Sequence, residues 1–217
     1  RELISAENIN PDNSKPYPFC LAYPLEKETE DLGNPEEWQA EYKWDGIRGQ
    51  LIKRNDEIFI WSRGEELVTP QFPELVSALE QIPGNFVLDG EILAVVDDEV
   101  LNFNELQKRL NRKTITAKML REIPVKVFVY DILEFNDEDL REKPLAERRK
   151  ILEALIVNHP LDNIKISEIV PFEKYWGAEK YHQNYFEINP NQPYCSAVVG
   201  PKVAKFKKHF GELGLLK

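Results

Sequence analysis

The chain has 217 residues, of which 42% are hydrophobic and 30% are charged, a composition typical of a folded globular protein. It contains no run of about 18 uninterrupted apolar residues, so we expect no membrane span. Taken alone, the net charge of −10 argues against nucleic acid as a partner. However, residues 26–41 hold seven acids and one lysine, whereas residues 202–208 hold four lysines and no acid, so one face could still bind a polyanion.

Hydrophobic patterns and turn residues predict a strand-rich chain. Residues 1–17 are rich in Pro and Asn and predict an extended lead-in to a domain of residues 18–217. Strands are expected at residues 38–43, 49–54, 57–62, 85–96, 125–133 and 163–170. Helices are expected at residues 70–79, 102–110 and 144–156. This order predicts an α+β fold with hairpins, not the regular βα alternation of a doubly wound sheet.

Two of these predictions carry more detail. Arg54, Asn55 and Asp56 separate two strand patterns and predict a hairpin. Residues 85–96 predict either a strand pair or one long strand with an irregularity at its glycine.

Few residues suit metal or redox chemistry. Cys20 and Cys195 are the only cysteines, which fits a reduced cytoplasmic protein and excludes a disulfide scaffold or a thiolate zinc site. The three histidines are scattered without ligand spacing. The chain begins with Arg1 and shows no signal peptide, so we expect it to be part of a longer protein.

The stretch EYKWDGIRGQ, at residues 41–50, contains the pattern K-x-D-G-x-R beginning at Lys43. An exposed lysine before an ordinary Asp-Gly turn is the plain alternative. Four fixed positions occur by chance in roughly one chain per thousand of this length, so the pattern needs support from other motifs. Arg63 in WSRG, Glu91 in VLDGEI and Tyr130 in VFVYD follow in order. An unpaired carboxylate at Glu91, on an apolar strand, would be costly.

A lysine pair follows near the end of the chain. Lys205 and Lys207 in KFKKHF are two residues apart and would share a face if that stretch were a strand.

Together these motifs resemble the adenylation (nucleotidyltransferase) domain of ATP-dependent DNA ligases, most closely the bacterial repair ligases. WQAEYKWDGIRGQLIKR, WSRGEEL, FPEL, VLDGEILA, LQKRLNRK, VYDILE and REKPLAERRKILE carry the resemblance, which runs from about Pro18 to Val170. It implies two packed antiparallel sheets with flanking helices and a nucleotide cleft between them. It also implies roles in DNA repair, recombination and replication.

By this resemblance, Lys43 attacks the α-phosphate of ATP, retains AMP and passes it to the 5′-phosphate at a DNA nick, after which the 3′-hydroxyl seals the strand. A free lysine has a pKa of about 10.4, so only roughly one in a few thousand is neutral near pH 7. Burial or nearby cations must favour the neutral form, and Arg48, Lys205 and Lys207 could supply positive charge. The same cations would offset phosphate charge.

The resemblance implies further roles. Glu41 would recognise the adenine amino group, Tyr130 would stack on adenine, and Arg48 and Arg63 would contact ribose and phosphates. Glu91 would contact the ribose or a water bound to Mg²⁺, the expected metal. The plain alternatives are that Glu41 is one more surface acid and that Tyr130 is a core aromatic residue. Arg48 and Arg63 could likewise be surface ion-pair residues.

Three aspartates are expected to hold turns and hydrogen bonds instead of performing chemistry. They are Asp45, Asp89 and Asp131.

The resemblance weakens over residues 171–204. The family carries a further strand with a metal-binding glutamate, whose place falls near Gln183, while Glu187 stands four residues later. The tryptophan that the family usually has two residues before Lys205 is Val203.

The resemblance also implies partners outside this chain. We expect an OB-fold domain and an N-terminal DNA-binding domain elsewhere in the protein, nicked double-stranded DNA as substrate, no membrane, and a monomer at the nucleoid of the bacterial cytoplasm. The alternatives are a degenerate nucleotidyltransferase fold that only binds nucleic acid, and an RNA ligase or capping enzyme.

Overall fold

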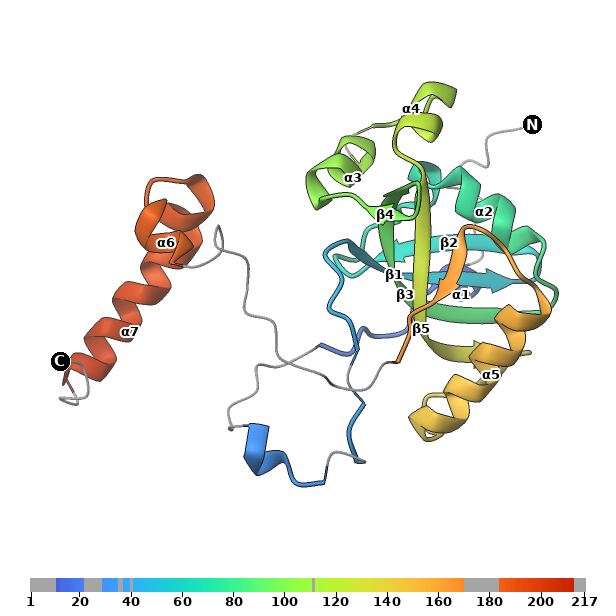
Figure 1. Cartoon of the computed structure of the whole chain (residues 1–217), viewed down its shortest axis with the longest axis horizontal. Helices are drawn as coiled ribbons and strands as arrows, with labels where there is room; N and C mark the ends of the chain where they lie inside the picture. The colour runs from blue at the N-terminus through green and yellow to red at the C-terminus, as the bar shows by residue number, and fades with distance from the viewer. Residues whose placement is uncertain are drawn as a thin grey trace. The chain divides into compact units, whose positions relative to one another are not determined.

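The computed structural model describes residues 11–21, 29–34, 37–39, 41–110, 112–169 and 184–212. The chain divides into two compact units, Arg1–Pro171 and Phe172–Lys217 (Figure 1). The single domain expected over residues 18–217 stays a prediction.

The first unit is built on one twisted sheet with the strand order β2-β1-β3-β5-β6. Two short strands join it at the side, β4 beside β3 and β7 beside β5. The strands are β1 (Ile47–Arg54), β2 (Glu57–Ser62), β3 (Phe86–Val96), β4 (Glu99–Val100), β5 (Val125–Phe135), β6 (Glu138–Asp139) and β7 (Ile164–Ile166). Neighbours are antiparallel except for β5 and β7, which are parallel. The described residues thus contain a mixed α/β fold with one sheet, where two packed sheets were expected.

Two predicted details of the sheet are confirmed. Asn55 and Asp56 join β1 to β2 with φ of 51° and 62°, the left-handed pair that a tight hairpin requires. Residues 86–96 form one long strand, and its register against β5 shifts between Asp89 and Gly90. A Cβ on Gly90 would lie 2.7 Å from the Phe128 carbonyl oxygen, so only glycine allows this close approach.

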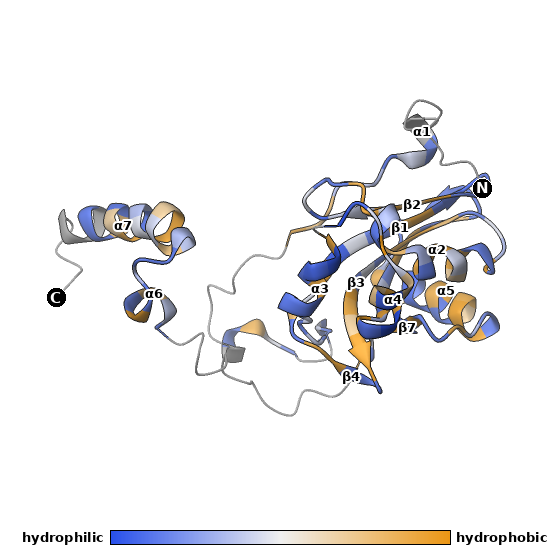
Figure 2. Ribbon diagram, turned by 90° about the horizontal axis from the view of Figure 1, so that it is seen from above, coloured by the Kyte–Doolittle hydropathy of each residue, from blue (hydrophilic) through white to orange (hydrophobic). Residues whose placement is uncertain are grey.

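Helices cover one face of the sheet. The predicted helices appear as α2 (Pro73–Glu80), α3 (Phe103–Leu110) and α5 (Leu145–Asn158). The structure adds η2 (Thr29–Leu32), η4 (Thr69–Gln71) and α4 (Ala117–Glu122). Leu75 and Leu79 of α2 and Leu152 of α5 are fully buried against this face, in the main core. Figure 2 shows the matching hydrophobic stretches along β3 and α5.

The opposite face carries a smaller apolar cluster of Ile52, Phe59, Val87 and Leu133. Tyr17 packs against this cluster from the N-terminal segment. That segment begins with the helical turn α1 (Pro11–Ser14), where an extended chain was expected.

Other predicted elements differ in the structure. The described part of residues 38–43 contains no strand, and only an isolated bridge joins Glu41 to Ile169. Trp38 and Tyr42 are 58% and 54% exposed, so their apolar alternation marks no buried strand face. The strand expected at 163–170 is limited to β7.

The second unit contains α6 (Tyr185–Ile188), the π-helical turn η5 (Cys195–Val199) and α7 (Gly200–Glu212). Lys205 and Lys207 both lie on α7. Residues two apart on a helix are separated by about 200°, so these lysines do not share a face as they would on a strand. Glu187 lies on α6, and Gln183 falls outside the described residues. Within the described ranges, no helix is long and apolar enough to cross a membrane.

Candidate active site

A cavity of about 1150 Å³ lies in the first unit, at the start of β1. Its lining comes from separate parts of the chain, including residues 41–48, the loop after β2, and single residues of β3, α3 and β5. Six of the predicted site residues line it: Glu41, Lys43, Arg48, Arg63, Glu91 and Tyr130. Lys205 and Lys207 belong to the second unit, so their role stays a prediction.

Lys43 is exposed and lies in an irregular segment just before β1. Its neighbour Trp44 anchors this segment, because the Trp44 indole Nε1 donates to Ser167 Oγ at 3.3 Å. The Trp44 ring also lies 4.9 Å from the Phe128 ring, between centroids. On the other side, the Glu41–Ile169 bridge holds the start of the segment. Lys43 is therefore a solvent-accessible amine on a backbone fixed at both sides.

Gly46 connects this segment to β3. A Cβ at this position would clash with the Ile92 carbonyl oxygen, so the backbone approach requires glycine. The Gly46 N–H donates to Glu91 Oε1 at 3.1 Å. The glycine of the Asp-Gly pair thus places the lysine segment directly against Glu91, the carboxylate predicted to contact the ribose or a metal-bound water.

Glu91 is half-buried on β3. Burial raises its pKa to about 7, although the Gly46 N–H and the charges of Arg48 and Arg63 act in the opposite direction. A carboxyl group that titrates near neutral pH inside a cavity is typical of functional sites.

Arg48 is held by three hydrogen bonds to fixed partners. Its Nε and Nη2 donate to the two carboxylate oxygens of Asp89 at 3.1 and 2.8 Å, and its Nη1 donates to the Cys20 carbonyl oxygen. The guanidinium lies 5.5 Å from the Phe19 ring centroid and 5.8 Å from that of Tyr130. Burial alone would lower the pKa of Arg48, but the hydrogen bonds and charge of Asp89 outweigh it and raise this pKa.

Tyr130 shares the same aspartate, since its hydroxyl donates to Asp89 Oδ1 at 3.2 Å. Burial raises the pKa of Tyr130, so the phenol stays neutral. Asp131 turns away and makes a two-point ion pair with Arg148, at 2.8 Å for each bond. Both aspartates therefore hold hydrogen bonds, as expected from the sequence.

Arg63 is positioned by its backbone. Its N–H donates to the Arg48 carbonyl oxygen at 2.9 Å, and the following turn is closed by Ser62 N–H donating to the Glu66 carbonyl oxygen at 2.9 Å. The Arg63 side chain is exposed and lines the cavity, so its guanidinium is accessible to an anion.

Several lining residues were missed in the sequence. Cys20, Leu21, Val68 and Leu110 form apolar or backbone parts of the wall. They carry no chemical motif, and they reach the cavity only because the first unit folds around it. The Asp89 carboxylate was expected to hold hydrogen bonds, but nothing in the sequence identified Arg48 and Tyr130 as its partners.

Mg²⁺ prefers oxygen ligands such as carboxylates. Four carboxylate side chains line the cavity: Glu41, Asp45, Glu66 and Glu91. Among the residues that the structure describes, no group of three or more His, Cys, Asp or Glu side chains is arranged to hold a metal. Such a cavity fits a metal that takes one or two carboxylates and completes its shell with phosphate oxygens and water.

The chain is similar in sequence to known DNA ligases. Residues 20–189 match the family model described as "ATP dependent DNA ligase domain". A protein named "Probable DNA ligase" from Koribacter versatilis (strain Ellin345) is 37% identical over 169 residues, which cover 73% of this chain and 29% of the relative. A DNA ligase of Saccharolobus islandicus (strain Y.N.15.51 / Yellowstone #2) is 38% identical over 150 residues, 64% of this chain and 24% of the relative.

Among solved structures, the ligase domain of M. tuberculosis LigD is 26% identical with a TM-score of 0.49, covering 60% of this chain and 40% of that one. The chain spans 29% and 24% of the length of the two curated relatives above. Because the family model covers well over half of the chain, this protein belongs to the family of ATP-dependent DNA ligase domains.

Proposed function

We propose that this chain is the catalytic adenylation domain of an ATP-dependent DNA ligase. The observation that carries the proposal is the single cavity that joins an accessible Lys43 to Arg48, Arg63, Glu91 and Tyr130. These residues are up to 87 positions apart, counted from Lys43 to Tyr130, and each matches a ligase motif. Membership of the family supports the same reaction.

In the first step, the neutral Lys43 amine attacks the α-phosphorus of ATP. A P–N bond forms, the bond from the α-phosphorus to the bridging oxygen breaks, pyrophosphate leaves and Nζ loses a proton to solvent. Fixed positive charge stabilises this transfer more than any other single effect. Arg48 uses three of its five N–H groups on Asp89 and Cys20, so the remaining donors can meet a phosphate or ribose oxygen.

Arg63 and Tyr130 complete the nucleotide contacts. The exposed guanidinium of Arg63 suits a second phosphate contact. The guanidinium of Arg48 lies near the Tyr130 ring, so adenine would stack on the part of the ring that Arg48 leaves open. Glu41, at the cavity edge, would accept a hydrogen bond from the adenine amino group.

Glu91 would hold Mg²⁺ together with the nucleotide phosphates. When bound, Mg²⁺ neutralises phosphate charge. With a pKa near 7, Glu91 is partly protonated in the nucleotide-free protein, so cation binding would release a proton.

We infer that the later steps need more than the described sheet. AMP would pass from Lys43 to the 5′-phosphate of a nick in double-stranded DNA, and the 3′-hydroxyl would displace it. An OB-fold domain, a second sheet of the nucleotidyltransferase fold and the lysines at 205 and 207 would complete the site. The protein would act as a monomer at the nucleoid of the bacterial cytoplasm in repair, recombination and replication.

The test is covalent labelling. The chain, and the longest natural protein that contains it, are incubated with α-labelled ATP and Mg²⁺, denatured and tested for retained label. We expect label on the wild type and on Lys118→Ala, an exposed control on α4, and none on Lys43→Ala.

Two further arms separate the alternatives. Labelling from ATP but not GTP would exclude a capping enzyme, and sealing of nicked DNA in preference to nicked RNA would exclude an RNA ligase. A longer protein that takes no label from ATP would contradict the proposal and favour a module that only binds nucleic acid.

A further inference from the structure

Three polar side chains of β1 point away from the main core, at alternate positions of the strand. They are Arg48, Gln50 and Arg54. Alternate residues of a strand share a face, and here that face is the one against which Tyr17 packs. Each of the three side chains binds the backbone of residues 13–21, a segment here called the N-terminal strap.

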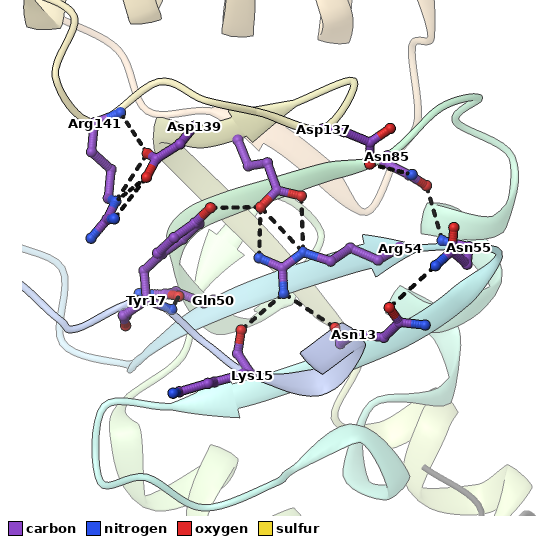
Figure 3. Close-up of polar contacts among 11 residues, drawn as sticks. Asn13, Lys15, Tyr17, Gln50, Arg54, Asn55, Asn85, Asp137, Asp139 and Arg141 are labelled. Atoms are coloured by element: carbon purple, nitrogen blue, oxygen red, sulfur yellow. Dashed lines mark hydrogen bonds and ion pairs between the residues drawn. The ribbon is translucent and has the colours of Figure 1, made fainter. Parts of the chain in front are cut away.

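Gln50 makes the central contact and is completely buried. Its Oε1 accepts the Tyr17 N–H at 2.8 Å and its Nε2 donates to the Tyr17 carbonyl oxygen at 2.9 Å (Figure 3). The amide thus pairs with the strap backbone as a neighbouring strand would. A buried amide is costly unless both of its ends are paired, so this glutamine and the docked strap depend on each other.

Arg54 holds the beginning of the strap. Its Nη1 donates to the carbonyl oxygens of Asn13 and Lys15 at 3.2 and 2.9 Å, while Glu134 accepts from its Nε and Nη2. The Tyr17 hydroxyl donates to the same Glu134 at 2.7 Å. Burial, followed by the hydrogen bond and charge of Glu134, raises the pKa of Tyr17 to about 12, so this donor persists at neutral pH.

Arg48 binds the other end of the strap, through the Cys20 carbonyl oxygen. The contacts run from Asn13 at Arg54, through Tyr17 at Gln50, to Cys20 at Arg48, so the strap is antiparallel to β1 and its register is set at three points. The strap ends at the cavity, which Cys20 and Leu21 line.

We propose that the N-terminal strap forms part of the wall of the nucleotide site and contributes to nucleotide affinity. Gln50 is the positioning residue that holds the strap on the sheet. The docked strap places Cys20 and Leu21 in the wall and fixes the edge of Arg48 that Asp89 leaves free. This inference rests on the proposed function, since the bound molecule is ATP. It concerns nucleotide affinity, because Gln50 itself is buried beneath the strap and does not line the cavity.

The test uses Gln50→Met, which keeps the length of the side chain but removes both hydrogen bonds. Two neutral hydrogen bonds of ordinary strength correspond to roughly tenfold or more in the docking equilibrium. We therefore expect hydrogen exchange of the Tyr17 amide to accelerate about tenfold. This exchange is measured on a peptide that covers residues 13–21. The KM for ATP in labelling of Lys43 should rise about three- to tenfold, with kcat within about twofold of wild type.

Leu51→Met is the matched control, because Leu51 is the equally buried next residue of β1 but faces the main core. It should reduce stability without changing strap exchange or the KM for ATP. Cys20 gives a second, direct readout in a Cys195→Ser background. ATP without Mg²⁺ should slow alkylation of the exposed Cys20 by a maleimide several-fold in the Cys195→Ser protein, and less when Gln50→Met is added.

Each result decides the inference. Faster strap exchange in Gln50→Met with an unchanged KM would show that the glutamine only stabilises the fold, and unchanged exchange would show that it does not dock the strap. If the wild type neither binds ATP nor takes label, the proposed function fails, and the nucleotide role of the strap fails with it. The exchange measurement needs no nucleotide, so it tests the docking of the strap by Gln50 even if the proposed function fails.

Discussion

Glu91→Gln isolates the effect of burying a carboxylate against Gly46. Glutamine keeps the shape and the acceptor oxygen for the Gly46 N–H but cannot ionise. The pKa of Glu91 rises from its ordinary value of 4.5 to about 7 in the folded protein, with burial as the main cause. In the folded state, the charged form is therefore the disfavoured one.

The sign of the effect on stability follows from proton binding. Between pH 4.5 and about 7 the folded protein keeps a proton on Glu91 that the unfolded chain has released, so stability falls as pH rises through this window. At about 1.4 kcal/mol per pKa unit, the upper limit is about 3 kcal/mol. Because Glu91 is partly exposed, solvent screening reduces this to about 1–2 kcal/mol.

The assay is urea unfolding of wild type and Glu91→Gln at several pH values from 4 to 8. The two proteins should be nearly equal near pH 4, and the variant should become more stable by about 1–2 kcal/mol above pH 7. Glu80→Gln, at an exposed position on α2, should follow the wild type throughout. A difference between Glu91→Gln and wild type that does not change with pH would refute the reasoning. The same variant should label poorly with ATP, since it loses the proposed Mg²⁺ ligand.

Two other substitutions test the frame of the site. Gly46→Ala should lower stability by about 2 kcal/mol or more in urea unfolding, because its Cβ would push the lysine segment away from β3, and the rate of Lys43 labelling should fall with it. An unchanged stability would contradict the close approach. Arg109→Met should cost about 3 kcal/mol, because Arg109 is fully buried and its loss leaves Glu74 unpaired. Lys108→Met, beside it on α3 but in an exposed ion pair, should cost less than about 0.5 kcal/mol, and equal losses would count against the buried pair.

The sequence alone determined much of the frame. The strands β1, β2, β3 and β5 and the helices α2, α3 and α5 lie where alternation, helical spacing and proline positions predict them. These signals are local, because each depends on residues within a few positions of one another. The K-x-D-G-x-R pattern likewise identified the lysine segment. Gly46 is required where the backbone passes close to β3, and Arg48 lies on β1 just after it, so both stand at a fixed distance in sequence from Lys43.

Local sequence patterns gave a wrong secondary structure where the described part of the fold supplies no partner strand for the segment. Residues 38–43 alternate like a strand, but among the residues that the structure describes, the bridge at Glu41 is the only strand-like pairing of this segment. The stretch around Lys205 is helical, so Lys205 and Lys207 do not share the face that they would share on a strand. A strand is stable only when other strands or a core cover it, and a short segment does not contain that information.

Only the tertiary structure decided how the site is held together. The bonds of Arg48 to Asp89 and of Gln50 to Tyr17 join residues 41 and 33 positions apart. The pKa of Glu91 depends on how completely the first unit removes it from water, which is a property of the fold and not of the neighbouring residues. The sequence determined which groups are available for nucleotidyl transfer. Folding determined which of them are paired, buried and brought to the cavity, because hydrogen bonding and desolvation act between atoms that meet only in three dimensions.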